Sequence, residues 1–314
     1  MCAFEQSISM INSKIMAGEA KVYTEMELLN RMKSGEDLTS LDVDLITMAF
    51  HSSISGSAAM LLVPVAGRGT FTRAKKIWLN GVPGHPGPAP NERLGVVDTL
   101  IFADEVCDDT SEIPCGARLL VDILNNREIR VKCLSAEGDM YHNSFASETL
   151  QFARMFTYNT FIPTSRVNAG DDGPSMNAHL RTIRRGNKVL LNKVPGIVIG
   201  RGSYGSSARE ALSLSAEMFG MTPLLIHDQS MSNSSPIAYS VALAIPVLDD
   251  SVLASVSTYL SKMKPEKDTR YFTESDEKLA EYLKELILKK EFHVTDSDVE
   301  VLYDSSEATM VRTP

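Results

Sequence analysis

The sequence is short of the features that mark membrane insertion, export or nucleic-acid binding. Its longest apolar run, residues 58–66, contains a proline and is too short to cross a bilayer. The first residues lack the charged and then apolar pattern of a signal peptide. Lys and Arg total 31 against 40 Asp and Glu, a net charge of -9, so no basic surface for a phosphate backbone is indicated. We therefore expect no membrane and no nucleic-acid partner.

Cysteine is also scarce. The four cysteines, Cys2, Cys107, Cys115 and Cys133, include no C-x-x-C pair, which argues against structural zinc and for a reducing compartment. The spacing of Cys107 and Cys115 fits neither zinc nor redox motifs and indicates free thiols in a loop, whereas Cys133 reads as a buried apolar residue. No iron–sulfur motif is present. We expect a cytoplasmic protein without a metal site. The sequence does not identify a cofactor.

What is present is an alternation of strand-like and helix-like segments. Strands are predicted at 43–50, 75–79, 96–103, 128–134, 224–227 and 241–247, with a hairpin joining 188–191 to 197–199. Helices are predicted after a capping box at Thr24 and Glu27, and at 118–124, 147–156, 208–219 and 276–290. This mixture predicts an α/β or mixed α+β fold, as a single large domain around a mixed sheet. We expect the domain at 8–255, with any internal break near 163–177, and a helical, acidic C-terminal tail at 256–314.

The densest turn signal is LNGVPGHPGPAPNERLGVVD, residues 79–98. Its four prolines and four glycines predict a stiff loop without regular structure between two strands. Rigid loops often carry chemistry, so the stretch is a candidate small-molecule site. The side chains it would present are Trp78, Asn80, His85, Asn91, Glu92 and Arg93. The alternative is a structural bridge with Glu92 and Arg93 in a surface ion pair.

A second candidate follows the apolar strand at 43–50, where His51 precedes a serine-rich turn. Ser53 and Ser55 would let the backbone approach a ligand closely, and ligands lie at strand ends in α/β sheets. His51 or His85 would then carry a proton. The alternative is a polar turn before the next element.

The stretch IVIGRGSYGSSARE contains a G-x-G-x-x-G pattern. Gly200, Arg201, Gly202 and Gly205 lie between a predicted strand and a predicted helix, and Asp228 follows a further predicted strand. A dinucleotide-binding fold uses this layout to hold a pyrophosphate at a helix N-terminus. Here the preceding strand reads as the second arm of a hairpin. A plain glycine turn, or a phosphate or carboxylate site near Arg201, is therefore an open alternative.

The stretch RGTFTRAKKIWLNGVPGHPGPAPNERLGVVD resembles the homocysteine-biosynthesis domain family, most nearly its branch of methanogenesis marker protein 16. Shorter motifs in the same order extend the resemblance over about residues 8–255: INSKIMAGEAKVYT, FARMF, GIVIGRGS and AIPVLDDSVL. The resemblance implies sulfur chemistry, in which reduced sulfur is added to aspartate semialdehyde to give homocysteine. It implies a small carboxylated metabolite as ligand, a sulfur-donor or electron-transfer protein as partner, and a cysteine thiolate as sulfur carrier.

The sequence departs from this family pattern at the cysteines. Met140 stands where the family has the cysteine of a G-T-D-C-Y motif, and Ala89 where the branch has that of G-P-C-P-N-E-R-L-G. An earlier family cysteine falls among residues 53–55, and no ferredoxin-like cysteines follow residue 247. A methionine thioether cannot form a persulfide, so sulfur transfer by the family's cysteines is in doubt.

Three hypotheses follow from the sequence. The first is a metabolite-binding scaffold or enzyme of sulfur incorporation, whose catalytic candidates are His51, His85, Cys107 and Cys115. The second is a non-catalytic partner or regulator in sulfur or methanogenic metabolism. The third is a nucleotide-binding oxidoreductase that uses the glycine-rich turn. We also expect a homo-oligomer.

Overall fold

The computed structural model describes residues 6–54, 56–105, 116–160, 182–204, 209–222, 238–262 and 274–295. Its helices are α1 (Ile8–Ala17), α2 (Glu25–Lys33), α3 (Gly116–Leu124), α4 (Asp250–Lys262) and α5 (Glu274–Leu288), with the short 3-10 helices η1 (Asn91–Leu94) and η2 (Ser147–Thr149). Its strands are β1 (Val22–Thr24), β2 (Leu45–Ser53), β3 (Ser57–Pro64), β4 (Ala74–Leu79), β5 (Val82–Pro86), β6 (Val96–Phe102), β7 (Ile129–Ser135), β8 (Met140–Phe145), β9 (Ala153–Thr160), β10 (Lys188–Leu191), β11 (Val194–Tyr204), β12 (Arg209–Glu217) and β13 (Ala238–Pro246).

The strands form one mixed sheet in the order β1-β2-β13-β10-β11-β12-β9-β3-β6-β5-β4-β7-β8. Only β1 and β2 pair in parallel among the described strands; the other pairs are antiparallel. The prediction of a mixed fold around one large sheet is confirmed, and so is the C-terminal helix, as α5.

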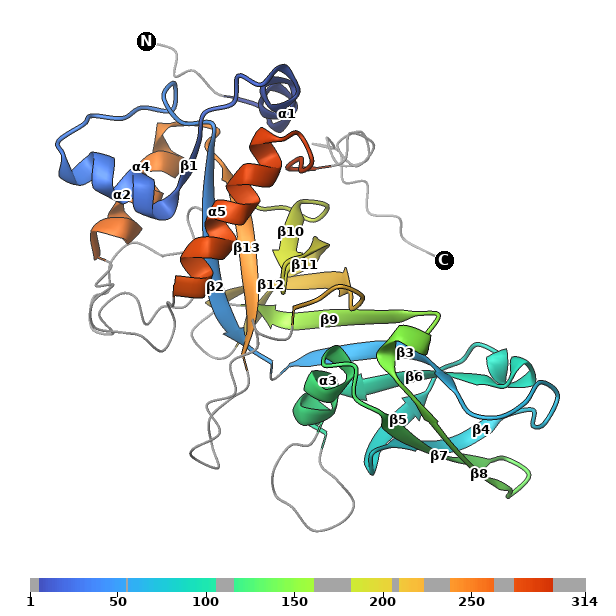
Figure 1. Cartoon of the computed structure of the whole chain (residues 1–314). Coiled ribbons are helices and arrows are strands. Elements are labelled where there is room, and N and C mark those ends of the chain that lie inside the picture. Colours follow the sequence, from blue (N-terminus) through green and yellow to red (C-terminus); the bar gives the residue numbers. More distant parts are fainter. Residues whose placement is uncertain are drawn as a thin grey trace, which may run out of the picture.

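The sheet curls back on itself. Residues 54–56 join β2 to β3, yet five other strands lie between these two in the sheet order. The Tyr239 hydroxyl on β13 and Thr160 Oγ1 on β9 are 2.7 Å apart, although β10, β11 and β12 separate their strands. In Figure 1 the long strands β2 and β13 run crosswise to β9 and β3, and the end of β2 and the starts of β3 and β13 come together near the end of β9.

Helices cover both faces of the β2–β13 part of the sheet, because side chains of a strand alternate between its faces. Leu45 and Ala49 of β2 pack with Leu283 of α5 and with residues of α1. Ile46 and Met48 point to the other face and join the larger core, which includes α2 and α4. A fully buried leucine such as Leu283 stabilises this packing by roughly 1.5–3 kcal/mol.

Local sequence accounts for where α2 begins. The Thr24 hydroxyl accepts from the Glu27 N–H, and the Glu27 carboxylate accepts from the Thr24 N–H. The two bonds satisfy donors that a helix start would otherwise leave unpaired. The predicted capping box is confirmed.

The expectation of a loop without regular structure at residues 79–98 is wrong. Asn80 and Gly81 have φ values of 50° and 88° and form the tight turn of a β4–β5 hairpin, in which Leu79 pairs with Val82. Further along, His85 pairs with Leu100 of β6, and the prolines of β5 lie within a strand despite lacking an N–H. After it, η1 supplies a single helical turn.

Two predicted helices are strands. Residues 208–219 contain β12, which pairs with β11 on one side and β9 on the other. Most of residues 147–156 form η2 and the start of β9. The helix-forming residues of β12 alternate apolar and polar along Leu-Ser-Leu-Ser, and pairing on both edges outweighs their helix propensity. The hairpin at 188–199 is confirmed as β10 and β11, whereas the strand expected at 224–227 lies outside the described residues.

Candidate functional site

A cluster of buried hydroxyl groups lies where β2, β13, β9 and β3 meet; we call it the junction cluster. Its members are Ser52, Ser57, Thr157, Thr160 and Tyr239, all at most 6% exposed. The hydroxyls of Thr157 and Thr160 are 2.7 Å apart, and Thr160 in turn bonds the Tyr239 hydroxyl. Ser57 Oγ is buried beside them, next to the Tyr239 hydroxyl. The curl of the sheet therefore gathers five hydroxyls from four strands.

The Tyr239 phenol is neutral at physiological pH. Burial raises its pKa, and this effect outweighs hydrogen bonding with Ser52 and Thr160, which acts in the opposite direction. A neutral phenol can donate a hydrogen bond to a carbonyl or carboxylate oxygen.

A buried histidine–carboxylate pair lies next to this cluster. His51, one residue before Ser52 on β2, faces α5, where its Nδ1 lies 2.5 Å from Oδ1 of Asp276. The side chains are 3% and 0% exposed. Asp276 lies in the first turn of α5, so the packing of that helix on β2 brings the pair together. A carboxylate at Nδ1 fixes the orientation of the imidazole ring, as in sites where histidine carries protons.

Burying this many polar groups in a core lowers the stability of the fold unless another interaction offsets the loss of solvation. A buried hydroxyl without a partner costs on the order of 1–3 kcal/mol, and a buried carboxylate loses several kcal/mol of solvation. Binding and catalytic sites are where proteins retain such groups. The junction cluster with His51 and Asp276 is therefore the candidate site.

The side chains of the 79–98 stretch do not converge. The Asn80 side chain accepts from the Arg130 N–H, and Asn91 Nδ2 donates to Asp98. Glu92 is buried and Oε1 accepts from the Ala74 N–H. These contacts hold strands and turns together. The three side chains therefore have structural roles in the described part of the chain.

His85 and Arg93 of that stretch, and Trp78 directly before it, lie in different surroundings. His85 is exposed, with Nε2 3.4 Å from Glu105 and its ring edge-on to Phe102. Arg93 is exposed in η1, and Trp78 lies on β4 between two lysines. The small-molecule site predicted here stays a prediction.

The serine-rich turn fits the candidate site better. Ser53 ends β2 and pairs with Ala238 of β13, directly beyond Ser52 and Tyr239, while Ser55 lies outside the described residues. Sequence reasoning thus pointed to His51 and its neighbours. It missed Thr157, Tyr239 and Asp276, which no local motif links to His51 because they come from distant parts of the chain.

The described part of the glycine-rich stretch does not have the strand-turn-helix arrangement that a dinucleotide site needs. Gly200, Arg201 and Gly202 lie inside β11, paired with β12, and the element that follows is a strand instead of a helix. Gly205 and Asp228 lie outside the described residues. The anion-site prediction therefore no longer has a helix N-terminus to support it.

Thiol chemistry does not come from Cys133. This side chain is fully buried, and burial, with the Glu92 charge as a second cause, raises its pKa to about 11. Almost none of it is thiolate at neutral pH, so it is a poor nucleophile. The prediction of a buried apolar residue is confirmed. Cys107 and Cys115 lie outside the described residues, and within those residues no group of His, Cys, Asp and Glu could hold a metal ion.

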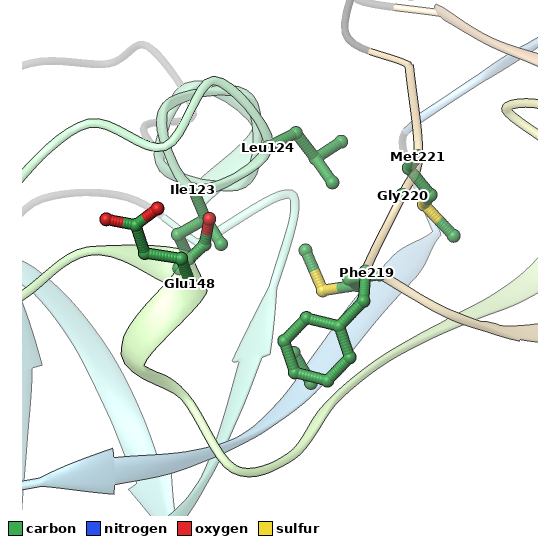
Figure 2. A pocket seen from close by; sticks show the side chains of 9 residues that line it. Ile123, Leu124, Glu148, Phe219, Gly220 and Met221 are labelled. Atoms are coloured by element: carbon green, nitrogen blue, oxygen red, sulfur yellow. The ribbon is translucent and has the colours of Figure 1, made fainter.

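A separate pocket of about 200 Å³ lies between α3 and the residues after β12 (Figure 2). It is mainly apolar, with Leu124 and Phe219 bordering the space and Glu148 as its carboxylate. No residue of the junction cluster lines it. None of the helices in the described ranges has the length and apolar character needed to span a membrane.

Comparison with known proteins gives three curated relatives of archaeal origin. An uncharacterised protein of Methanothermobacter thermautotrophicus is 29% identical over 296 residues, which is 85% of this chain and 68% of the relative. One of Methanocaldococcus jannaschii is 27% identical over 260 residues, 74% of this chain and 65% of its own length. The L-aspartate semialdehyde sulfurtransferase of Methanosarcina acetivorans is 22% identical over 296 residues, 81% of this chain and 56% of its own.

The chain thus spans between about half and two thirds of the length of these relatives. No solved structure matches it. The model of one family, described as homocysteine biosynthesis enzyme, sulfur-incorporation, matches residues 20–167 and 164–264. These matches cover most of the chain, and the protein therefore belongs to the family of sulfur-incorporating homocysteine biosynthesis enzymes.

Proposed function

We propose that the protein binds a small metabolite with a carboxylate and a carbonyl group, of the aspartate-semialdehyde kind, for sulfur incorporation. The observation that carries the proposal is the buried set of hydroxyls beside the His51–Asp276 pair. Hydroxyl groups are suitable donors for carboxylate and carbonyl oxygens. The name of the Methanosarcina relative supports the choice of ligand class.

The two parts of the site would have different tasks. Ser52 and Tyr239 pair across β2 and β13, and their hydroxyls would hold the ligand's oxygens. His51 points to the other side of β2, and a ligand at the end of the strand would meet both sides. There His51, oriented by Asp276, would take up or give a proton as sulfur adds to the carbonyl carbon.

The sulfur would be the outer sulfur of a persulfide on Cys107 or Cys115, passed on from a persulfide donor that is left as a thiol, or it would come directly from a donor protein. The chain on either side of residues 106–115 is held near the junction cluster. The Ala103 N–H donates to the Ser57 carbonyl oxygen at 2.9 Å, and the Gly116 N–H to that of Glu105 at 3.1 Å. These contacts place the described residues that precede and follow the two cysteines in the sequence near Ser57, which supports a role for the cysteines.

A second candidate is a non-catalytic partner in the same metabolism. It is favoured by the residues that replace the family cysteines, since Met140 is 42% exposed on β8 and cannot carry a persulfide. Synthesis of homocysteine by the purified protein with a sulfide source and a reductant would exclude this candidate.

Ligand-induced thermal stabilisation tests the binding proposal. We expect aspartate semialdehyde, or aspartate as a stable analogue, to raise the melting temperature of the wild type. Tyr239→Phe and His51→Gln should reduce this rise, whereas His85→Gln, a change at an exposed histidine, should leave it intact. An equal rise in all four proteins would place the ligand elsewhere.

Thiol labelling tests the sulfur route separately. Iodoacetamide at pH 8 should label Cys107 or Cys115 much faster than Cys133, whose pKa of about 11 keeps it protonated. Ligand should slow the labelling of the faster cysteine. If neither cysteine labels faster than a free thiol of ordinary pKa, and Cys107→Ser and Cys115→Ser keep full activity, sulfur comes from a donor protein.

A further inference from the structure

The last strand of the sheet, β8, has an open edge. It pairs with β7 along its length, from Met140 opposite Leu134 to Phe145 opposite Ile129, and no described strand lies on its other side. Figure 1 shows β8 at the outer end of the sheet, away from the helices around β2. Half of the N–H and C=O groups of such a strand point outward, ready to pair with another chain.

This edge lacks the usual protection. Natural edge strands carry lysines, prolines, inward charges or bulges that keep other strands away. The residues of β8, MYHNSF, include no proline, no lysine and no carboxylate, and their pairing with β7 runs without a register shift. Four of the six side chains are exposed. The edge is therefore open to an added strand.

The exposed face beside this edge is basic. Lys132 of β7 lies between Trp78 of β4 and His142 of β8 in the register, and Arg130 follows on the same face. The ammonium groups of Lys132 and Lys76 lie 5.2 and 6.0 Å from the Trp78 ring centroid.

No described carboxylate pairs with these cations. Within the described part of the chain, Lys76, Arg130 and Lys132 have no carboxylate within ion-pair distance. Glu128, at the border of this face, instead accepts from the Ser144 hydroxyl. The concentration of positive charge contrasts with the net charge of -9 of the whole chain.

We propose that β8 pairs with an extended acidic segment of a partner protein, which continues the sheet by one strand. The added strand would lie about 5 Å from β8 and about 10 Å from β7, within reach of the long side chains of Arg130 and Lys132. Carboxylates on alternate residues of the segment would meet these cations, while the backbone pairs with β8.

The charge selects against a second copy of this chain as the occupant. If two copies paired through β8, two faces carrying Arg130, Lys132 and His142 would be side by side. Lys132 and Arg130 of one copy would then lie about 15 Å from those of the other, and the two β8 strands between them carry no carboxylate to offset the repulsion. An acidic segment turns the same charges into attraction, which is why we infer that partner.

A fluorescein-labelled ten-residue peptide of alternating glutamate and valine is a direct probe. With the full chain, we expect a rise in fluorescence anisotropy that weakens as salt is added, and slower hydrogen exchange of the β8 amides. The same peptide with lysine for glutamate should not bind. Lys132→Glu and Arg130→Glu should each weaken binding roughly tenfold, because each change turns attraction into repulsion.

Lys33→Glu on α2 is the matched control, since it makes the same charge change at another exposed lysine and should change binding less than twofold. Equal binding of both peptides, or equal weakening by Lys33→Glu, would overturn the proposal. So would protection of β8 that grows with protein concentration in the absence of peptide, because a second copy would then occupy the edge. Tight binding of a uridine oligonucleotide to the basic face, with β8 amides unprotected, would also reject it.

Discussion

Removing Asp276 should destabilise the protein more than removing any exposed carboxylate. Its Oδ1 lies 2.5 Å from His51 Nδ1, and both side chains are at most 3% exposed, so water cannot replace the lost partner. Breaking one member of such a buried pair typically costs about 3–5 kcal/mol. Total stabilities are about 5–15 kcal/mol, so Asp276→Ala should move the urea midpoint far downward.

The double replacement separates the pair from its neighbours. Changing both residues to apolar ones of similar size, as in His51→Leu with Asp276→Leu, removes the mismatch, and we expect it to recover much of the stability lost in Asp276→Ala. Asp276→Asn should lie between these limits, because the amide keeps the shape but not the charge.

Urea unfolding followed by circular dichroism and by fluorescence of Trp78 measures these differences. The double-mutant cycle gives the coupling energy of the pair, which should be at least about 1 kcal/mol. Asp37→Ala, at an exposed carboxylate shortly after α2, is the control and should leave the midpoint almost unchanged. A cost below about 1 kcal/mol for Asp276→Ala, or a double variant no more stable than that single one, would refute the reasoning.

Two further predictions concern pH and backbone conformation. Burial raises the pKa of Glu27, but hydrogen bonds from Lys284 and Thr24 outweigh it and leave the pKa lowered. The stability from this contact between α2 and α5 is therefore present above the ordinary pKa of 4.5 and is lost as pH falls through the lower folded value. Glu27→Gln should cost less than about 1 kcal/mol at pH 7 and less still at pH 2.5, and an equal cost at both would contradict this. Gly95→Ala should cost more than about 2 kcal/mol, because φ is +86° and the added Cβ would lie 2.1 Å from the Ala66 oxygen. Gly138→Ala, at φ +100° in open space, should cost only about 1 kcal/mol, so similar losses would show that the contact with Ala66 is unimportant.

Local signals predicted most elements of the fold. The capping box at Thr24, the apolar run that became β2 and the hairpin of β10 and β11 all depend on neighbours in sequence, and the structure agrees with them. The errors lie where tertiary pairing decides. The residues of β12 have helical propensity and those at the start of β9 have apolar residues at helical spacing, but each strand is paired on both edges, which no local window shows.

Only the part of the site around His51 could be predicted from the sequence. The turn after β2 showed a histidine and serines at a strand end, and those residues do border the junction cluster. Tyr239 and Asp276 come from more than 180 residues further along the chain. Their approach depends on the curl of the sheet and the packing of α5, which have no signature in residue spacing.

The pairing of β2 with β13 has a consequence for how the protein is made. In the register of these strands, residues such as Phe50 and Val241 are partners although roughly 190 residues separate them. During synthesis the apolar strand β2 has no partner until roughly 190 further residues have been made, and α5 emerges later still. A chain released before α5 would therefore expose β2 and lack Asp276, so the candidate site is complete only after α5 has left the ribosome, and the nascent protein is open to chaperones and proteases until then.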